Sequence, residues 1–252
     1  MQGQAQEDDL VLARDAAPFY LKLSESVLLQ TPGHGPLAVT VSSGFTQYAY
    51  AFVAFEADRL ESQDAKAARQ QRVRAARLYW RAQRHAMVAL ESQTPGFARA
   101  LEAGTAALTQ EQVALAYWAS AAWGSAISLS KDQPEAVADL PQVQRLAELA
   151  WRLEPAHGNG ALSALLGTLE ASRPGGQQAA AQRFFQSART HSRGQNAGVP
   201  VAEAEAMALG DRSAYEQLLR ESLAVAQAHR NLANEVMRAR AQWLLDTADE
   251  RF

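Results

Sequence analysis

The chain has 252 residues, no cysteine and a formal net charge of −3 at pH 7. These values exclude disulfides, thiolate metal sites and a cysteine nucleophile, and the slight acidity gives no reason to expect a nucleic-acid partner. Hydrophobic residues make up 48% of the sequence, which is enough to bury a substantial core and argues against disorder.

The spacing of apolar residues predicts an all-α fold. Apolar and polar residues alternate over four or more positions only in "LAVTV", whereas Ala, Leu, Gln, Glu and Arg recur at helical spacing through long segments. No low-complexity linker is present, so we expect a single domain over residues 1–252. About ten helices are expected between turn-forming segments. These segments lie at 31–36, 94–97, 132–141, 154–160, 173–176 and 193–200.

Two runs contain no charged side chain, one between Glu25 and Glu56 and the other between Glu111 and Lys131. The first is long enough to span a bilayer, but it has a polar centre that includes Thr40. The second contains four serines and is no more hydrophobic. Helices without charge are otherwise found surrounded by protein, so we expect both runs inside an all-helical domain.

The segment from Asp64 to Glu91 is expected to be one long helix with two different stripes. No acidic residue lies between these two positions. A cationic stripe can bind phosphate or a carboxylated partner, but it can also be a solvated face or a set of arginines paired with acids of neighbouring helices. The apolar stripe is Ala75, Tyr79, Ala82 and Ala86. The cationic stripe, a candidate partner surface, is Arg74, Arg77, Arg81 and Arg84.

Internal similarity indicates degenerate tetratricopeptide repeats. The second helix of that repeat carries a small residue, an aromatic residue four positions later and a small residue three positions after that. Ala75, Tyr79 and Ala82 fit this pattern, as do Ala181, Phe185 and Ala188, and the helix that ends with Ala150 is followed by Pro155 at the expected spacing. The charge-free runs stand at first-helix positions. We therefore predict a superhelical array of tetratricopeptide-like helix pairs.

First helices line the inner surface of such an array, so the aromatic residues of the charge-free runs are expected to face inward. They can line a cavity or channel for a small apolar, amphipathic or carboxylated solute. Simple packing in the core is the alternative. The candidate lining residues are Gln47, Tyr48, Tyr50, Tyr117, Trp118, Ser120 and Trp123.

The sequence contains no recognisable catalytic constellation. The five histidines are scattered without a metal-binding spacing, and neither a Walker motif nor a G-x-S-x-G motif is present. We therefore expect no enzymatic activity, no metal site and no cofactor.

Several blocks in the same order resemble the T component associated with tripartite ATP-independent periplasmic (TRAP) transporters, and the resemblance extends from about Ala13 to Phe252. The blocks are "GFTQYAYAFV", "RVRAARLYWRA", "AYWASAAWGSAISLSKD", "LAELAWRLEPAHGNGAL", "RPGGQQAAAQRFFQSA" and "RARAQWLLDTADERF". The resemblance implies an all-helical protein with cryptic tetratricopeptide repeats, usually a periplasmic lipoprotein. It also implies association with a periplasmic solute-binding subunit and a homo-oligomer, a trimer in the family.

The chain departs from the family pattern at its start, where "MQGQAQEDDL" shows neither a signal peptide nor a lipid-bearing cysteine. We expect residues 1–12 to be a flexible remnant that follows a removed signal and lipid-attachment site, with a lipid anchor in the full-length precursor. A generic tetratricopeptide scaffold for protein interactions, without any ligand, is the alternative function.

Overall fold

A computed structural model describes residues 7–252, and this part of the chain is helical without any β-strand. The all-α prediction is thereby confirmed. The described residues form two compact units, an N-terminal unit of residues 14–153 and a C-terminal unit of residues 154–252 that also includes residues 7–13. The single domain stays a prediction. Of the segment expected to be flexible, residues 1–6 lie outside the described residues, and Leu10 to Leu12 already belong to the first helix.

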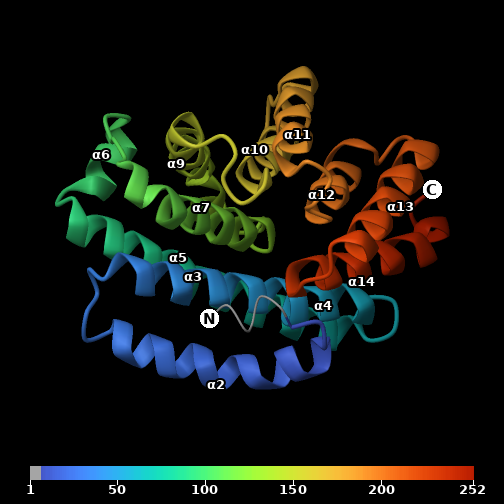
Figure 1. Ribbon diagram of the computed structural model, residues 1–252, viewed down its shortest axis with the longest axis horizontal. Helices are drawn as coiled ribbons and strands as arrows, with labels where there is room; N and C mark the ends of the chain where they lie inside the picture. The colour runs from blue at the N-terminus through green and yellow to red at the C-terminus, as the bar shows by residue number, and fades with distance from the viewer. Residues whose placement is uncertain (1–6) are drawn as a thin grey trace. The chain divides into compact units, whose positions relative to one another are not determined.

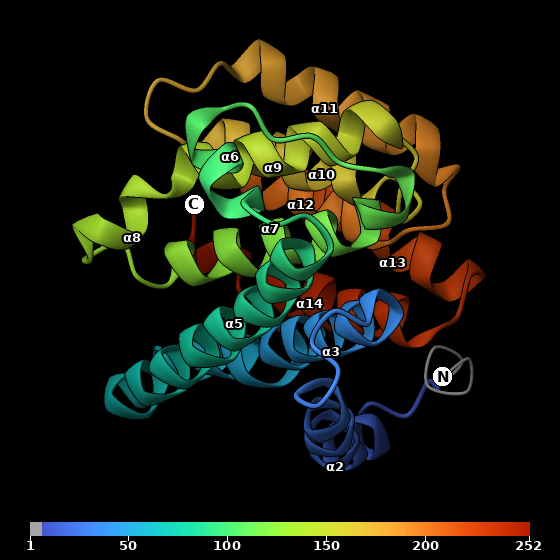
Figure 2. The ribbon, with the colours of Figure 1, turned by 90° about the vertical axis from the view of Figure 1, so that its left-hand side faces the viewer.

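The N-terminal unit is built around the long helix α5, which packs against α3, α4 and α7, and α7 in turn packs against α9 (Figure 1). Helix α2 runs along the outer side of α3 in both ribbon views (Figure 2). The helices of this unit are α2 (Leu10–Leu28), which belongs to it from Arg14 onward, α3 (Gly35–Tyr48), α4 (Phe55–Leu60), α5 (Ala65–Gln93), α6 (Phe97–Ala103), α7 (Val113–Ser128), α8 (Pro134–Ala138) and α9 (Leu140–Leu153).

Helix α5 begins and ends within two residues of the predicted bounds. Its first turn is capped by Asp64, whose carboxylate accepts a hydrogen bond of 2.9 Å from the amide of Ala67. It ends at Gln93, just before a Thr-Pro pair that cannot continue the helix. The predicted apolar stripe is fully buried, and its small side chains let neighbouring helices approach closely. The stripe is Ala75, Tyr79, Ala82 and Ala86.

The first charge-free run forms a helical stretch that is not interrupted between Gly35 and Leu60. His34 caps it, because its Nδ1 accepts a hydrogen bond of 3.1 Å from the amide of Leu37. In the middle, Ala49–Ala54 winds as a π-helix between α3 and α4. π-Helical segments are rare and occur often at functional sites.

The second charge-free run forms α7, preceded by the short 3₁₀ turn Gln110–Gln112. Thr109 and Gln112 make a reciprocal capping box at this turn. Within residues 7–252, no helix combines the length and the hydropathy needed to cross a bilayer.

The C-terminal unit pairs α10 with α11, α12 with α13 and α13 with α14 (Figure 1). Gly167 on α10 makes close packing possible, because a β-carbon there would lie 2.8 Å from the ring of Phe185 on α11. The helices are α10 (Ala161–Ser172), α11 (Gln178–Ser192), α12 (Gly198–Met207), α13 (Arg212–Ala228) and α14 (Leu232–Asp246), with a final 3₁₀ turn at Ala248–Glu250.

The residues that indicated tetratricopeptide repeats are buried. Ala181, Phe185 and Ala188 are at most 1% exposed, and Ala150 on α9 is fully enclosed. Burial of these positions agrees with paired helices in each unit, whereas the superhelical array itself stays a prediction. One expected break differs, since Pro134–Ala138 forms the short helix α8.

Candidate functional site

The arginines of α5 divide into two groups with different surroundings. Arg81 belongs to the first group, and its guanidinium bonds both carboxylate oxygens of Glu25 on α2. It also lies over the ring of Phe45, at 5.0 Å from the ring centroid. Arg81 is therefore an internal tie between α5, α3 and α2.

Glu25 is a buried carboxylate, 2% exposed, that gathers three basic groups. Lys22 Nζ lies 2.6 Å from Oε2, and His85 Nε2 lies 2.7 Å from Oε1. Burial opposes ionisation of Glu25, but hydrogen bonds from Arg81, Lys22 and His85 outweigh it and lower the pKa of Glu25 to about 2. The cluster fixes α2 to the unit through ionic contacts.

Arg74 also turns toward its own unit. Its guanidinium lies 3.5 Å from the hydroxyl of Tyr48 and 6.0 Å from the centroid of the same ring. Arg74 and Arg81 are seven residues apart, so they lie on the same edge of α5, the edge that faces α3 and α2.

Arg77 and Arg84 form the second group and are exposed. Seven residues apart as well, they lie on the neighbouring edge of α5. Lys66 and Arg69 extend this edge toward the start of the helix. None of these four side chains forms an ion pair with any of the described residues. We name Lys66, Arg69, Arg77 and Arg84 the cationic face.

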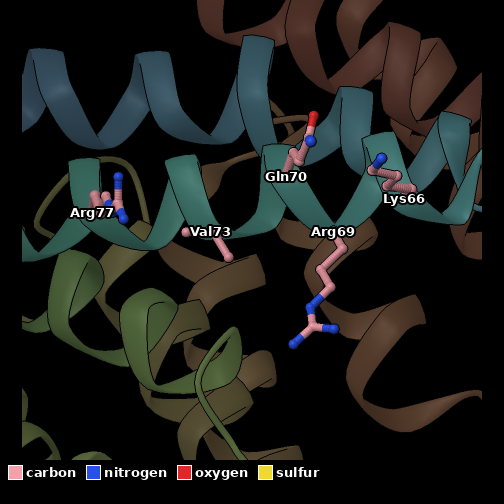
Figure 3. Close-up of a pocket in the computed structure, with 5 residues that line it drawn as sticks. All are labelled: Lys66, Arg69, Gln70, Val73 and Arg77. Atoms are coloured by element: carbon pink, nitrogen blue, oxygen red, sulfur yellow. The ribbon is translucent and has the colours of Figure 1, made fainter.

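The cationic face borders an open hollow of about 350 Å³ on α5 (Figure 3). Arg69 extends away from the helix in this view, and Val73 lies between it and Arg77. The lining residues are Lys66, Arg69, Gln70, Val73 and Arg77. From Lys66 to Arg84 the face extends over about 27 Å, at 1.5 Å per residue of helix.

Acids of neighbouring helices do reach other parts of α5. Arg72 lies 2.5 Å from Glu61 and 4.0 Å from Asp58, both in or next to α4. Carboxylates of α2 and of the α4 region therefore pair with α5, but no carboxylate of residues 7–252 pairs with the cationic face. Four neighbouring guanidinium and ammonium groups without counter-charge can bind carboxylates or phosphates.

The four arginines of the predicted stripe thus divide between the two groups. Arg77 and Arg84 belong to the cationic face, whereas Arg74 and Arg81 are occupied within the unit. Lys66 and Arg69 were missed by the sequence reasoning. The three- and four-residue spacing that connects Lys66, Arg69, Val73 and Arg77 was the available signal.

The candidate solute residues of the first charge-free run lie in different surroundings. Gln47 is exposed. Tyr48 and Tyr50 are half-buried and pack against a core cluster that includes Ala75 and Tyr79. For these two tyrosines, core packing accounts for their apolar contacts.

The candidates on α7 include an aromatic pair. The rings of Tyr117 and Trp118 contact each other edge to face, with centroids 4.8 Å apart. Removal from water raises the pKa of the Tyr117 hydroxyl to about 12, so this group is neutral at physiological pH.

Two further candidates on α7 are buried polar groups. Ser120 is fully buried and Trp123 is 6% exposed. Neither the Ser120 hydroxyl nor the Trp123 indole nitrogen has a hydrogen-bond partner among residues 7–252. Such groups are costly to bury unless they gain a partner. None of the seven solute candidates lines the hollow beside the cationic face.

No group of three or more histidine, aspartate or glutamate side chains in the described part of the chain could hold a metal ion.

Comparison with known proteins shows the family of the chain. A family model described as TRAP transporter T-component matches residues 6–252. The chain belongs to the TRAP transporter T-component family. A curated relative in Treponema pallidum (strain Nichols), named only as an uncharacterized protein, is 28% identical over 255 residues, which cover 95% of this chain and 79% of the relative. Membership in the T-component family indicates an accessory role in TRAP transport, and this family is a transporter component, not an enzyme family.

Proposed function

We propose that this T component docks onto the periplasmic solute-binding subunit of its TRAP transporter through the cationic face of α5. The observation that carries this proposal is the row of four cations without an ion pair to any of the described residues, on a helix where Arg72 and Arg81 are paired with acids and Arg74 contacts Tyr48. The family model over nearly the whole chain supports a TRAP subunit as the partner.

Rigid presentation favours such an interface. The cationic side chains come from one helix that is fixed by its buried stripe, so little backbone order has to be gained on binding. Val73, 46% exposed, offers an apolar contact between Arg69 and Arg77. A complementary partner presents carboxylates around a small apolar patch.

Sedimentation velocity tests the proposal with the cognate solute-binding subunit at micromolar concentration and low salt. We expect a complex with the unchanged chain and at least a tenfold loss of affinity when Lys66, Arg69, Arg77 and Arg84 are all replaced by Gln. A matched control removes four exposed cations elsewhere that also form no ion pair with the described residues, at Arg99, Lys131, Arg183 and Arg193. Equal losses in both variants would show that only net charge matters, and an intact complex in the first variant would move the interface away from α5.

We propose in addition that α7 contacts a small apolar or carboxylated solute. The buried hydroxyl of Ser120 and indole nitrogen of Trp123, which lack partners among the described residues, support this role, because a polar group of a solute could satisfy them. Native mass spectrometry with added decanoate as the probe should show one bound molecule, and Ser120→Ala together with Trp123→Phe should abolish binding while the helical signal is retained. Binding of the subunit without any solute would favour a pure interaction scaffold.

The proposed docking partner is periplasmic, so we place this T component in the periplasm, held by a lipid anchor in the full-length precursor. Fractionation of cells that express the complete gene tests this placement. Recovery of the protein in the cytoplasmic fraction would contradict it.

A further inference from the structure

The loop between α9 and α10 contains a chemically labile pair of residues. The chain has four asparagines, and Asn159 is the one that a glycine follows. Gly160 has no side chain, so its backbone nitrogen can approach the side-chain amide carbon of Asn159 without steric hindrance. Attack by such a nitrogen is one reason why asparagine counts among the thermolabile residues of proteins.

The side chain of Asn159 lies in solvent. It is exposed, and no hydrogen bond joins its amide group to any of residues 7–252. The φ of Asn159 is 51°, in the left-handed region, and it stands between Gly158 at 62° and Gly160 at 84°. The side chain is therefore free to turn toward the nitrogen of Gly160.

The attacking nitrogen is held only weakly in the loop. The amide of Gly160 donates to the carbonyl of Ala156 at 3.4 Å, which is long for a hydrogen bond of this type. A stronger restraint comes from Asn196, whose Nδ2 donates to the carbonyl of Gly158 at 3.3 Å and to that of Asn159 at 3.1 Å. The contacts of Asn196 are those that must loosen before the peptide of Asn159 can rotate.

The other three asparagines are held by hydrogen bonds of their side chains. Asn196 Oδ1 accepts from the amide of Gly198 at 2.9 Å, and Asn231 Oδ1 accepts from the amide of Asn234 at 3.0 Å. Asn234 is 3% exposed, and its Oδ1 accepts from the amide of Ala197 at 3.0 Å. These side chains cannot turn toward the following nitrogen without losing their bonds.

We propose that Asn159 is a site of spontaneous deamidation. The nitrogen of Gly160 loses its proton to a base in the solvent and bonds Cγ of Asn159, the bond between Cγ and Nδ2 breaks, and ammonia leaves with a proton from water. Water then adds to one of the two ring carbonyls of the succinimide. Opening at Cγ gives aspartate, and opening at the main-chain carbonyl gives isoaspartate.

The two products have different consequences for the start of α10. Aspartate keeps the backbone and places a negative charge before the first turn of the helix, where the helix dipole favours it. Isoaspartate adds a methylene group to the main chain just before Gly160. A β-carbon on Gly160 would lie 2.3 Å from the carbonyl oxygen of Ala188 on α11, so the backbone has no room to shift there. Isoaspartate should therefore weaken the packing of α10 on α11.

Peptide mapping by mass spectrometry tests the proposal on the full chain, kept folded at mildly alkaline pH or unfolded in guanidinium chloride. In the folded chain we expect Asn159 to deamidate at least tenfold faster than Asn196, Asn231 and Asn234, and protein isoaspartate methyltransferase should label the product. The proposal fails if Asn159 stays intact in the folded chain while it deamidates in the unfolded one. Equal rates at all four asparagines would overturn it as well.

Two variants test the part that the loop plays. Asn196→Ala removes the restraint on the loop carbonyls and should speed deamidation of Asn159 severalfold. Gln242→Ala removes a hydrogen bond to Asp246 elsewhere in the C-terminal unit and should leave the rate unchanged. Equal rates in the two variants would overturn the restraint assigned to Asn196.

Thermal unfolding followed by circular dichroism tests the consequence of the modification. The aged chain contains isoaspartate, whereas the Asn159→Asp variant contains only aspartate. We expect the aged chain to melt at a lower temperature than this variant. Equal melting temperatures would overturn the effect assigned to isoaspartate.

Discussion

The two units differ in whether basic side chains on their helices have acidic partners within the chain. In the C-terminal unit, Arg189 on α11 lies 2.6 Å from Glu203 and 2.7 Å from Glu221, which belong to α12 and α13. Arg212 and Arg220 share Glu216 within α13 at 2.8 Å and 2.6 Å. On α5 of the N-terminal unit, by contrast, four cations stand in a row without an ion pair to the described residues.

A shortage of acid does not cause this difference, since the chain has 27 acidic and 24 basic residues. Glu216 stands four residues from each of its arginines, which is the spacing at which side chains meet on a helix. Helix α5 has no acid before Glu91, so its cations depend on other helices or on a partner. The comparison teaches that the position of acids, not their number, leaves a surface available for binding.

The largest effect is expected at Glu25, the buried acid that other helices supply to α5. Glu25→Ala leaves Arg81, His85 and Lys22 without their carboxylate, and we expect a loss of about 2–4 kcal/mol in the free energy of unfolding. Urea unfolding measures this loss. Glu216→Ala, which removes an acid from exposed pairs in the C-terminal unit, should cost about 1 kcal/mol or less. Equal costs would show that the two units do not differ in this respect.

Lowering the pH should reveal how much the ionised carboxylate of Glu25 contributes to stability. The pKa of Glu25 is lowered from 4.5 to about 2. A depressed folded-state pKa contributes stability that is fully present above the unfolded value and is lost as the pH falls through the folded value. Stability should therefore decline between about pH 4.5 and pH 2, and Glu25→Gln should flatten this decline. An identical pH profile for the variant would contradict the ionic role of Glu25.

A smaller effect is expected at Arg189, which is 35% exposed and connects α11 to α12 and α13. Arg189→Ala should lower the free energy of unfolding by about 1 kcal/mol. Exposed ion pairs contribute little to stability, and Arg189 contributes this much because its guanidinium pairs with two carboxylates at once. Urea unfolding of this variant, compared with Arg183→Ala on the same helix, tests the prediction. The Arg183 side chain has no ion pair within the described residues, so its removal should cost less.

The smallest effect on stability is expected at the cationic face. Replacement of Lys66, Arg69, Arg77 and Arg84 by Gln removes no ion pair among residues 7–252, and the free energy of unfolding should change by less than about 0.5 kcal/mol. A larger loss, measured by urea unfolding, would mean that these side chains serve the fold and not a partner.

Much of the fold follows from local patterns in the sequence. The bounds of α5 were predictable because Asp64 caps the helix and a Thr-Pro pair ends it. The buried stripe of Ala75 and Tyr79 followed from helical spacing alone. The division into two compact units was not predictable, since no linker of distinct composition separates residue 153 from residue 154.

The candidate site was predictable only in part. The stripe of four arginines was recognised, but Glu25 lies 56 residues from Arg81 in the sequence, and no local pattern connects them. Lys66 and Arg69 could have been found by following the helical spacing back to the start of α5. Ser120 was a candidate from its place among aromatic residues, whereas its burial without a hydrogen-bond partner among the described residues depends on the packing of several helices.

The salt dependence of subunit binding tests the central claim most directly. The affinity of the cognate solute-binding subunit should be measured between low and physiological ionic strength for the unchanged chain and for the variant with Gln at Lys66, Arg69, Arg77 and Arg84. If the cationic face makes the contact, affinity for the unchanged chain falls steeply with salt, and the variant binds more weakly with a flatter dependence. Equal affinities and equal salt dependences for the two proteins would contradict the claim that α5 is the docking surface.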